Sequence, residues 1–259
     1  FANHTYTVTQ NLAGSTGTKT QCFQLLKDST LTFKNGTIKA NNGNVAMIIQ
    51  NYSNLTLENM LLDGASITRN DATIYTMSNN CGNVEIKDTK INTVPNGVAF
   101  DVYGGFGNYS DVTVTVTGSS EINGNIEVAR DSGTQNKNTL AINGGTINGE
   151  LAVTDNEKTE ITISGGSFSQ PVKEEYCADG FIPKDNGDGT YTFEMPADKV
   201  TVEASFSWVN PFADVANNAY YVRAVEWMLK RKVTQGTTDT TFSPNLNCTR
   251  AQIVTFLWR

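Results

Sequence analysis

The sequence predicts a mainly β protein: a single-stranded parallel β-helix over residues 1–172, a small β-hairpin cap over residues 173–208, and an all-α repeat over residues 209–259. Three observations lead to this prediction. A short apolar pattern recurs along the first segment, a glycine-rich hairpin signal follows it, and the last segment changes to helical periodicity.

The recurring pattern is a pair of alternating apolar residues, a turn and a further apolar residue. It occurs at residues 31–38, 55–62, 84–91, 114–122, 140–147 and 161–168. Counting from the second apolar residue of each pair (Phe33, Leu57, Ile86, Val116, Ile142 and Ile163) gives steps of 24, 29, 30, 26 and 21 residues. A third apolar stretch lies between successive occurrences of this pattern, at residues 22–26, 45–49, 73–77, 98–102, 125–128 and 150–153. One such unit cannot bury its apolar face alone, so stacking of units into a solenoid is expected.

The unequal steps place the additional residues in loops, which carry function more often than the coils do. The expected protruding loops are residues 64–71, 94–97, 104–111 and 129–138. Asparagine-rich corners are expected to form side-chain ladders or left-handed turns, at Asn51 with Asn54 and at Asn79 with Asn80 and Asn83.

The cap is indicated by Asn-Gly-Asp-Gly at residues 186–189, a hairpin signal between apolar alternations. Residues 176–206 resemble a short strand module found downstream of solenoids in surface proteins of Firmicutes. We expect this module to protect the last coil from edge-to-edge pairing.

Composition excludes several classes of function. A net charge of -7 argues against nucleic acid as a partner, because such binding depends on Lys and Arg. No run approaches the length of a membrane span. The four cysteines, Cys22, Cys81, Cys177 and Cys248, form no CxxC pair and no cluster with histidine. We therefore expect free thiols, no metal site and no cofactor.

The C-terminal segment carries five ordered blocks, at residues 212–215, 221–227, 233–236, 242–244 and 249–259. These blocks resemble an S-layer homology repeat, which we expect to be the first of several in the parent protein. The resemblance implies a helix, a loop and a second helix, with three repeats assembling into grooves that bind secondary cell-wall polysaccharide bearing pyruvate ketals. The whole chain resembles Firmicutes surface proteins in which a right-handed parallel β-helix carries such repeats.

Five residues of this segment are candidates for polymer binding. The Arg250 guanidinium can bind a carboxylate bidentately, and Thr249 is expected to cap the helix that Arg250 begins. Gly236 permits close approach of the backbone to a ligand, and Asp214 could accept hydrogen bonds from sugar hydroxyls or orient Arg250. Trp227 is the fifth candidate. The structural alternatives are that Asp214 caps the first helix, Trp227 packs in the core and Arg250 pairs with a carboxylate of a neighbouring repeat. The family more often has Glu where this chain has Gln252.

A catalytic site is one possibility for this fold, because many β-helices cleave polysaccharides with paired carboxylates or basic residues. The one histidine, His4, lies at the start of the chain, and the aspartates are scattered rather than paired. Asp101 alternates with Phe100 and Val102 and is expected to face outward beside Tyr103. With Phe106 and Tyr109, these two residues form a possible ligand face, whose alternative is a long turn closing a wide coil.

The sequence therefore predicts a noncatalytic extracellular protein associated with the cell wall or S-layer. Its β-helical rod would recognise a host or microbial glycan or protein, and its helical repeat would anchor it to wall polysaccharide. The alternatives are a carbohydrate-active β-helix enzyme at the cell surface and a spacer without a ligand.

Overall fold

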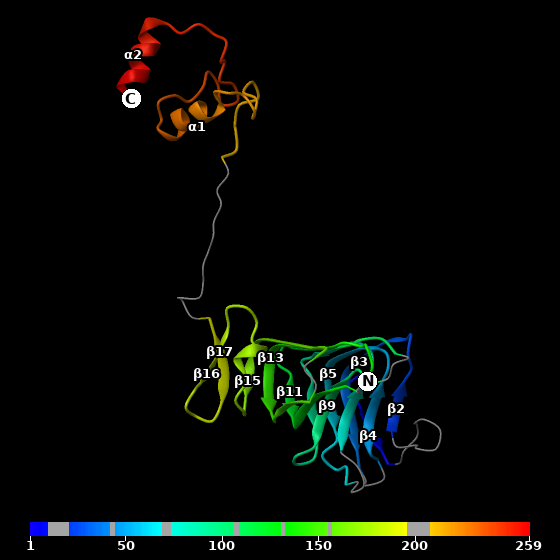
Figure 1. The fold of residues 1–259 in the computed structure, drawn as a ribbon. Helices are drawn as coiled ribbons and strands as arrows, with labels where there is room; N and C mark the ends of the chain where they lie inside the picture. The colour runs from blue at the N-terminus through cyan, green and yellow to red at the C-terminus, as the bar shows by residue number, and fades with distance from the viewer. Residues whose placement is uncertain are drawn as a thin grey trace. The chain divides into compact units, whose positions relative to one another are not determined.

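The structure is a computed structural model that describes residues 1–9, 21–41, 45–68, 74–105, 109–130, 133–154, 157–195 and 208–259 (Figure 1). The chain divides into two compact units, Phe1–Val200 and Thr201–Arg259. We call them unit 1 and unit 2 and describe each by itself.

Unit 1 is a β-solenoid built from two sheets. Sheet A has 11 strands. They are β1 (Thr5–Val8), β3 (Thr30–Ala40), β5 (Asn54–Asp63), β7 (Gly82–Lys87), β8 (Lys90–Asn92), β10 (Val112–Thr117), β11 (Glu121–Asn123), β13 (Asn138–Asn148), β15 (Thr159–Phe168), β16 (Ile182–Asp185) and β17 (Tyr191–Glu194). Sheet B has six, β2 (Gln21–Leu25), β4 (Met47–Asn51), β6 (Tyr75–Asn79), β9 (Val98–Tyr103), β12 (Asn125–Ala129) and β14 (Leu151–Val153).

The strand register confirms the predicted repeat. In sheet A, Phe33 pairs with Leu57, and the pairing continues through Ile86, Val116 and Ile142 to Ile163. A second row runs from Ile38 through Leu62, Ile91, Ile122 and Ile147 to Phe168. In sheet B, a third row runs from Phe23 through Ile49, Met77, Phe100 and Ile126 to Leu151. All of these pairs are parallel, as a single-stranded solenoid requires.

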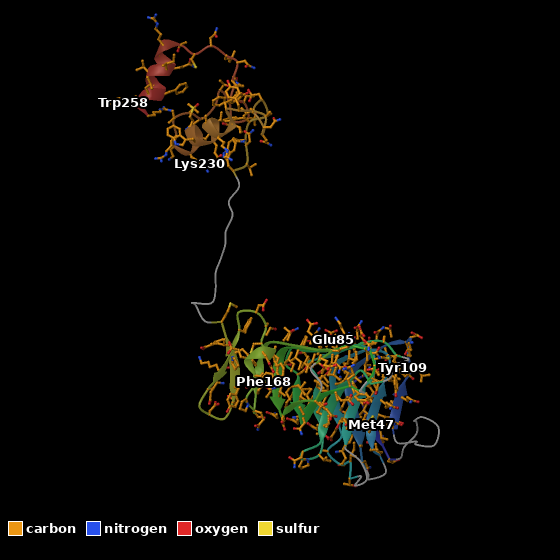
Figure 2. The ribbon with its side chains drawn as sticks, in the orientation of Figure 1. Met47, Glu85, Tyr109, Phe168, Lys230 and Trp258 are labelled. Carbon is orange, nitrogen blue, oxygen red and sulfur yellow. The ribbon has the colours of Figure 1, made fainter. Side chains whose placement is uncertain are left out.

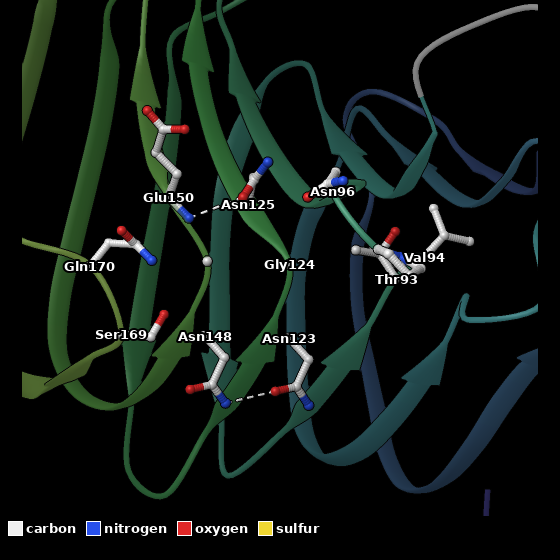
Figure 3. Close-up of a pocket in the computed structure, with 12 residues that line it drawn as sticks. Thr93, Val94, Asn96, Asn123, Gly124, Asn125, Asn148, Glu150, Ser169 and Gln170 are labelled. Atoms are coloured by element: carbon white, nitrogen blue, oxygen red, sulfur yellow. Dashed lines mark hydrogen bonds between the residues drawn. The ribbon is translucent and has the colours of Figure 1, made fainter. Parts of the chain in front are cut away.

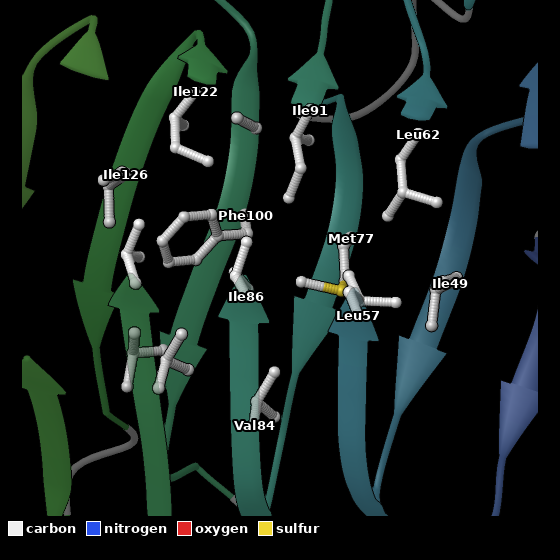
Figure 4. Packing of buried hydrophobic residues seen from close by; sticks show 14 of the residues in the cluster. Ile49, Leu57, Leu62, Met77, Val84, Ile86, Ile91, Phe100, Ile122 and Ile126 are labelled. Carbon is white, nitrogen blue, oxygen red and sulfur yellow. The ribbon is translucent and has the colours of Figure 1, made fainter. Parts of the chain in front are cut away.

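The core lies between the two sheets, and every coil contributes one inward-facing residue to each of the three rows (Figure 4). Leu57, Ile86 and Phe100 are fully buried, as are most residues of the three rows. Parallel in-register stacking gives every inward side chain an apolar neighbour above and below. Removing this surface from water stabilises the fold by roughly 25 cal/mol per Å² of apolar area.

The corners of the coils form the ladders expected of their asparagines, but none of the five residues named for them, Asn51, Asn54, Asn79, Asn80 and Asn83, has the positive φ of a left-handed turn. Asn51 Nδ2 donates to Asn79 Oδ1 at 3.4 Å between buried side chains, and Asn54 Oδ1 accepts from the Asn83 backbone N–H at 2.9 Å. At the bend within sheet A, Asn35 and Asn59 both have positive φ and are joined by a side-chain hydrogen bond of 2.9 Å. These ladders satisfy polar groups at turns where the sheet ladder is interrupted.

The predicted hairpin forms at the C-terminal end of unit 1. β16 and β17 pair antiparallel around residues 186–190, and β17 pairs with β15 through Tyr191 and Phe168. Phe193 packs edge-to-face on Phe168 with ring centroids 5.3 Å apart. Before the hairpin, the single-turn helix η1 (Glu174–Tyr176) buries Tyr176 in the solenoid core. The hairpin thus extends sheet A beyond β15, the last strand of the parallel coils.

Unit 2 contains two helices, α1 (Val222–Lys230) and α2 (Arg250–Trp258), as Figure 1 shows. Figure 2 marks Lys230 and Trp258 at their C-terminal ends. An isolated antiparallel bridge between Thr238 and Thr241 lies in the segment that joins them.

Candidate functional site

The small core of unit 2 positions the candidate binding residues. Phe212, Val215 and Val225 are buried, and Trp208, Tyr221, Val222, Leu229 and Phe242 pack against them. Val222, Val225 and Leu229 recur at helical spacing, so α1 buries one apolar stripe and leaves its other faces in water. Phe242 comes from the segment after α1, which fixes that segment to the core.

Asp214 anchors this segment rather than capping a helix. Its Oδ1 accepts the Phe242 backbone N–H at 2.8 Å, and its Oδ2 accepts the Ser243 backbone N–H at 2.7 Å. These two donors hold the pKa of Asp214 below its ordinary value. The expected capping of the first helix by Asp214 is wrong, because Tyr221 occupies the N-cap of α1 and no side chain caps it. No hydrogen bond or ion pair between Asp214 and Arg250 occurs among the described residues.

Gly236 is required by the packing of the same segment. Its φ is +85°, and a Cβ atom there would lie 2.5 Å from Cε1 of Phe212 and 2.7 Å from the Thr241 carbonyl oxygen. Any larger residue would displace the core phenylalanine or the bridge at Thr241. The close approach expected at Gly236 is therefore made by the protein itself.

The N-terminus of α2 has the predicted geometry. Thr249 is the N-cap, and its Oγ1 accepts the Gln252 backbone N–H at 3.2 Å. Gln252 Oε1 in turn accepts the Thr249 backbone N–H at 2.8 Å, which completes a capping box. The box needs only an acceptor oxygen, so Gln serves where the family more often has Glu. Arg250, the first residue of α2, is exposed.

Trp227 lies on α1 with 57% of its surface exposed and does not belong to the core of unit 2. The alternative that Trp227 packs in the core is therefore wrong. The Arg231 guanidinium carbon lies 6.0 Å from the centre of the Trp227 ring, at the limit of a cation–π contact. An exposed indole beside a guanidinium offers both a stacking surface and a positive charge.

A cavity of about 450 Å³ lies between the segment after α1 and α2. Its lining includes Gly236, Ser243, Gln252 and Arg259. Of the five predicted binding residues, only Gly236 lines this cavity; Asp214, Trp227, Thr249 and Arg250 lie outside its lining. The sequence analysis did not identify Ser243 or Arg259, which adds a cation to the cavity at the C-terminal end of α2, opposite the end that carries Thr249 and Arg250.

The charge of the two units differs in sign. Unit 2, residues 201–259, contains six Lys and Arg against four acidic residues, a net charge of +2. Unit 1, residues 1–200, contains 13 Lys and Arg against 22 acidic residues, a net charge of -9. The positive charge favours association of unit 2 with an anionic polymer, while unit 1 repels one.

The predicted ligand face of unit 1 differs from expectation at Asp101. This residue is only 5% exposed, so its predicted outward exposure is wrong. Oδ2 accepts the Ser78 hydroxyl at 2.8 Å and Oδ1 accepts the Asn79 backbone N–H at 2.6 Å. Burial raises the pKa of Asp101 to about 7, against the opposing effect of these two hydrogen bonds. Asp101 therefore joins two neighbouring coils.

The aromatic residues near Asp101 also pack within unit 1. Tyr109 stacks on Tyr52 with ring centroids 4.7 Å apart, and burial raises the pKa of Tyr52 to about 12. The Tyr103 ring covers the backbone of Gly105, because a Cβ atom there would lie 2.0 Å from Cε1 of Tyr103. Phe106 lies outside the described residues.

The described parts of the chain also bear on metal binding, thiol chemistry and membrane insertion. There, no group of three or more His, Cys, Asp or Glu side chains could hold a metal ion. The cysteines are free thiols, with Cys22 and Cys81 buried. In the same described residues, neither helix has the length and apolar character needed to cross a membrane.

Asp214 provides a prediction about unit 2. The substitution Asp214→Asn should speed amide hydrogen exchange at Phe242 and Ser243, because an amide NH2 group, which donates, replaces one of the two carboxylate oxygens that accept. The protection should be present above the unfolded pKa of the carboxyl and be lost as pH falls through its lowered folded value. NMR exchange rates measure this, and Asp239→Asn is the control on an exposed loop residue. Unchanged exchange in Asp214→Asn would contradict the anchoring role.

Residues 211–254 match the model of the S-layer homology domain family. No curated protein and no solved structure matches the chain. S-layer homology domains bind cell-wall polymers, so the match implies that this β-solenoid protein is anchored at the cell surface or wall.

Proposed function

We propose that the protein is an extracellular, noncatalytic recognition rod that unit 2 anchors to secondary cell-wall polysaccharide. The observation that carries the anchoring is the match of residues 211–254 to the S-layer homology domain. The net charge of +2 on unit 2 supports an anionic polymer as its partner. Unit 1 supplies a rigid stack of coils that adhesion or recognition at the wall or S-layer would use.

Within unit 2, Arg250 is the residue that we propose to contact the polymer. It is exposed at the first position of a capped helix of nine residues, where backbone N–H groups also favour an anion. A planar guanidinium binds a carboxylate, such as that of a pyruvate ketal, through two parallel hydrogen bonds. Trp227 with Arg231, and Thr249 beside Arg250, would provide further contacts to the sugar.

We further propose that additional repeats pack against α2. No residue of α2 is buried, and the exposed fractions of Leu257 and Trp258 are 83% and 89%. Apolar side chains of this size normally lie in an interface. This exposure supports the pseudo-threefold assembly that the family resemblance implies.

The anchoring is tested by sedimentation of the protein with purified Gram-positive cell walls. Arg250→Ala should weaken retention at least about tenfold, because hydrogen bonds to charged groups contribute roughly 1.5–3 kcal/mol. Lys230→Ala is the matched control: it also removes one exposed positive charge from a helix of unit 2. Arg250→Lys should recover only part of the binding, since an ammonium cannot bind a carboxylate bidentately.

Walls stripped of their secondary polymer provide the second control and should retain neither the wild-type protein nor the variants. Equal retention of the wild-type protein and Arg250→Ala would remove Arg250 from the proposed site. Equal retention on intact and stripped walls would overturn polymer binding itself.

A further inference from the structure

A polar groove runs along one outer corner of unit 1, where sheet A passes into sheet B (Figure 3). Its volume is about 630 Å³. Four successive coils line it, through residues 93–96, 123–125, 148–150 and 169–170. Neighbouring coils are separated by about 4.8 Å, so the groove spans about 14 Å along the solenoid axis.

Backbone forms the floor of the groove. A Cβ atom at Gly149 would lie 2.1 Å from the Gly124 carbonyl oxygen, so the two coils approach too closely for a side chain. The Gly124 N–H donates to the Asn148 carbonyl at 3.0 Å, and the Asn125 N–H donates to the Gly97 carbonyl at 3.0 Å. The floor is therefore both flat and internally hydrogen-bonded.

One side of the groove is an asparagine ladder. Asn123 Nδ2 donates to Asn92 Oδ1 at 2.8 Å and to Glu121 Oε1 at 2.8 Å, while Asn123 Oδ1 accepts from Asn148 Nδ2 at 2.8 Å. Both Nδ2 protons of Asn123 are thus used, and its Oδ1 fixes Asn148. Asn148 is exposed, and among the described residues nothing donates to its Oδ1 or accepts its second Nδ2 proton.

The other side carries Asn96, Asn125 and Glu150, and Gln170 of the last coil also lines the groove. Asn125 Oδ1 accepts the Glu150 backbone N–H at 3.0 Å, which orients its Nδ2 group without using it. Figure 3 shows Asn123 and Asn148 on one side of Gly124, with Asn125 and Glu150 on the other. Polar side chains therefore flank the backbone floor on both sides and extend away from it.

We infer that this groove binds an extended, neutral oligosaccharide lying along the solenoid axis. Side-chain amides both donate and accept hydrogen bonds, which matches the hydroxyl groups of sugars. The lining contains one carboxylate and no cation, which disfavours anionic sugars. The inference rests on the recognition role proposed for unit 1, but it does not require that unit 2 binds the wall.

A peptide fits this groove less well. Peptides bind solenoids or sheets most readily by pairing with a free strand edge. At this corner the backbone groups are already paired between coils, and Val94 and Pro95 are the main apolar side chains in the lining. A sugar chain needs neither a free edge nor deep apolar pockets.

The test is isothermal titration calorimetry of the full chain with cellohexaose, xylohexaose and mannohexaose, with an oligogalacturonate of similar length as the anionic comparison. At least one neutral probe should bind, and more tightly than the oligogalacturonate. The double variant Asn148→Ala/Gln170→Ala should weaken that binding by about tenfold. Gln24→Ala, which breaks the hydrogen bond between Gln24 and Gln50 on sheet B, is the matched control and should bind normally.

Binding of none of the neutral probes, preference for the oligogalacturonate, or undiminished binding by the folded double variant would overturn the inference. Thermal unfolding followed by circular dichroism establishes that each variant is folded. Arg250→Ala should leave oligosaccharide binding unchanged, so failure of the groove and failure of wall anchoring give different results.

Discussion

Phe100→Ala is expected to lower the free energy of unfolding of unit 1 by about 3–5 kcal/mol. Phe100 is fully buried and lies between Met77 and Ile126 in the row of sheet B residues that face the core. Coils above and below fix its surroundings, so the structure cannot collapse fully into the space that a phenylalanine leaves. Each coil depends on its neighbours, and the loss should therefore be felt by the whole stack.

Urea unfolding followed by far-UV circular dichroism measures this effect. Phe100→Leu is the control, because it keeps most of the apolar volume and should cost much less. All three tryptophans, Trp208, Trp227 and Trp258, lie in unit 2, so tryptophan fluorescence follows that unit separately. A change of less than 1 kcal/mol in Phe100→Ala would contradict the tight packing of the middle coils.

The stability of unit 1 is expected to fall as pH rises toward neutrality, and Asp101→Asn should remove this dependence. The pKa of Asp101 is raised to about 7 in the folded state, chiefly by burial. The folded state therefore keeps a proton that the unfolded chain loses near pH 4. The stabilisation is complete below the unfolded pKa and is lost as pH rises through about 7, a change on the order of 4 kcal/mol.

The substitution keeps the shape of the carboxyl group. Asn Oδ1 can still accept the Asn79 N–H, and the Ser78 hydroxyl can turn to accept from Nδ2. Thermal unfolding between pH 4 and pH 8 should show the wild-type and variant curves separating as pH rises, with the variant the more stable at pH 8. Asp88→Asn is the comparison, since hydrogen bonds from Ser119 lower the pKa of that exposed carboxyl. Parallel curves of stability against pH for the wild-type protein and Asp101→Asn would show that ionisation of Asp101 does not destabilise the folded state.

The strand register could be predicted from sequence because each coil repeats the same inward-facing residues. A one-residue slip would turn Leu57 or Ile86 toward water, so the apolar pairs determine the pairing. The N-cap at Thr249 was predictable for a similar reason. It depends on a hydroxyl and an amide three residues apart, Thr249 and Gln252, and not on distant parts of the chain.

The roles of Asp101 and Asp214 could not be predicted in this way. Alternation places Asp101 on the outer side of sheet B, but its burial depends on Ser78 and Asn79 from the preceding coil. Asp214 binds backbone groups 28 and 29 residues later, where no sequence pattern indicates a contact. Both positions are set by tertiary structure.

The sequence contains a recurring pattern from which the groove could have been predicted. An Asn-Gly pair occurs at Asn96–Gly97, Asn123–Gly124 and Asn148–Gly149, close to the same position of three successive coils. Taken singly, each pair indicates a turn. Their recurrence with the solenoid period marks the glycine floor of the groove, whereas the in-register row of amides beside it is formed by Asn92, Asn123 and Asn148.

The hairpin at the end of the solenoid has a mechanical consequence for a protein held at a surface. Unit 2 follows β17 in the chain, so tension between the anchor and a ligand bound on the coils passes through β17 first. In sheet A, β17 is joined to β15 by the pairing of Tyr191 with Phe168 and to β16 by four pairs. Under load we therefore expect the pairing of β17 with β15 to break before the parallel pairing between coils. The hairpin would then unfold first and leave the coils intact.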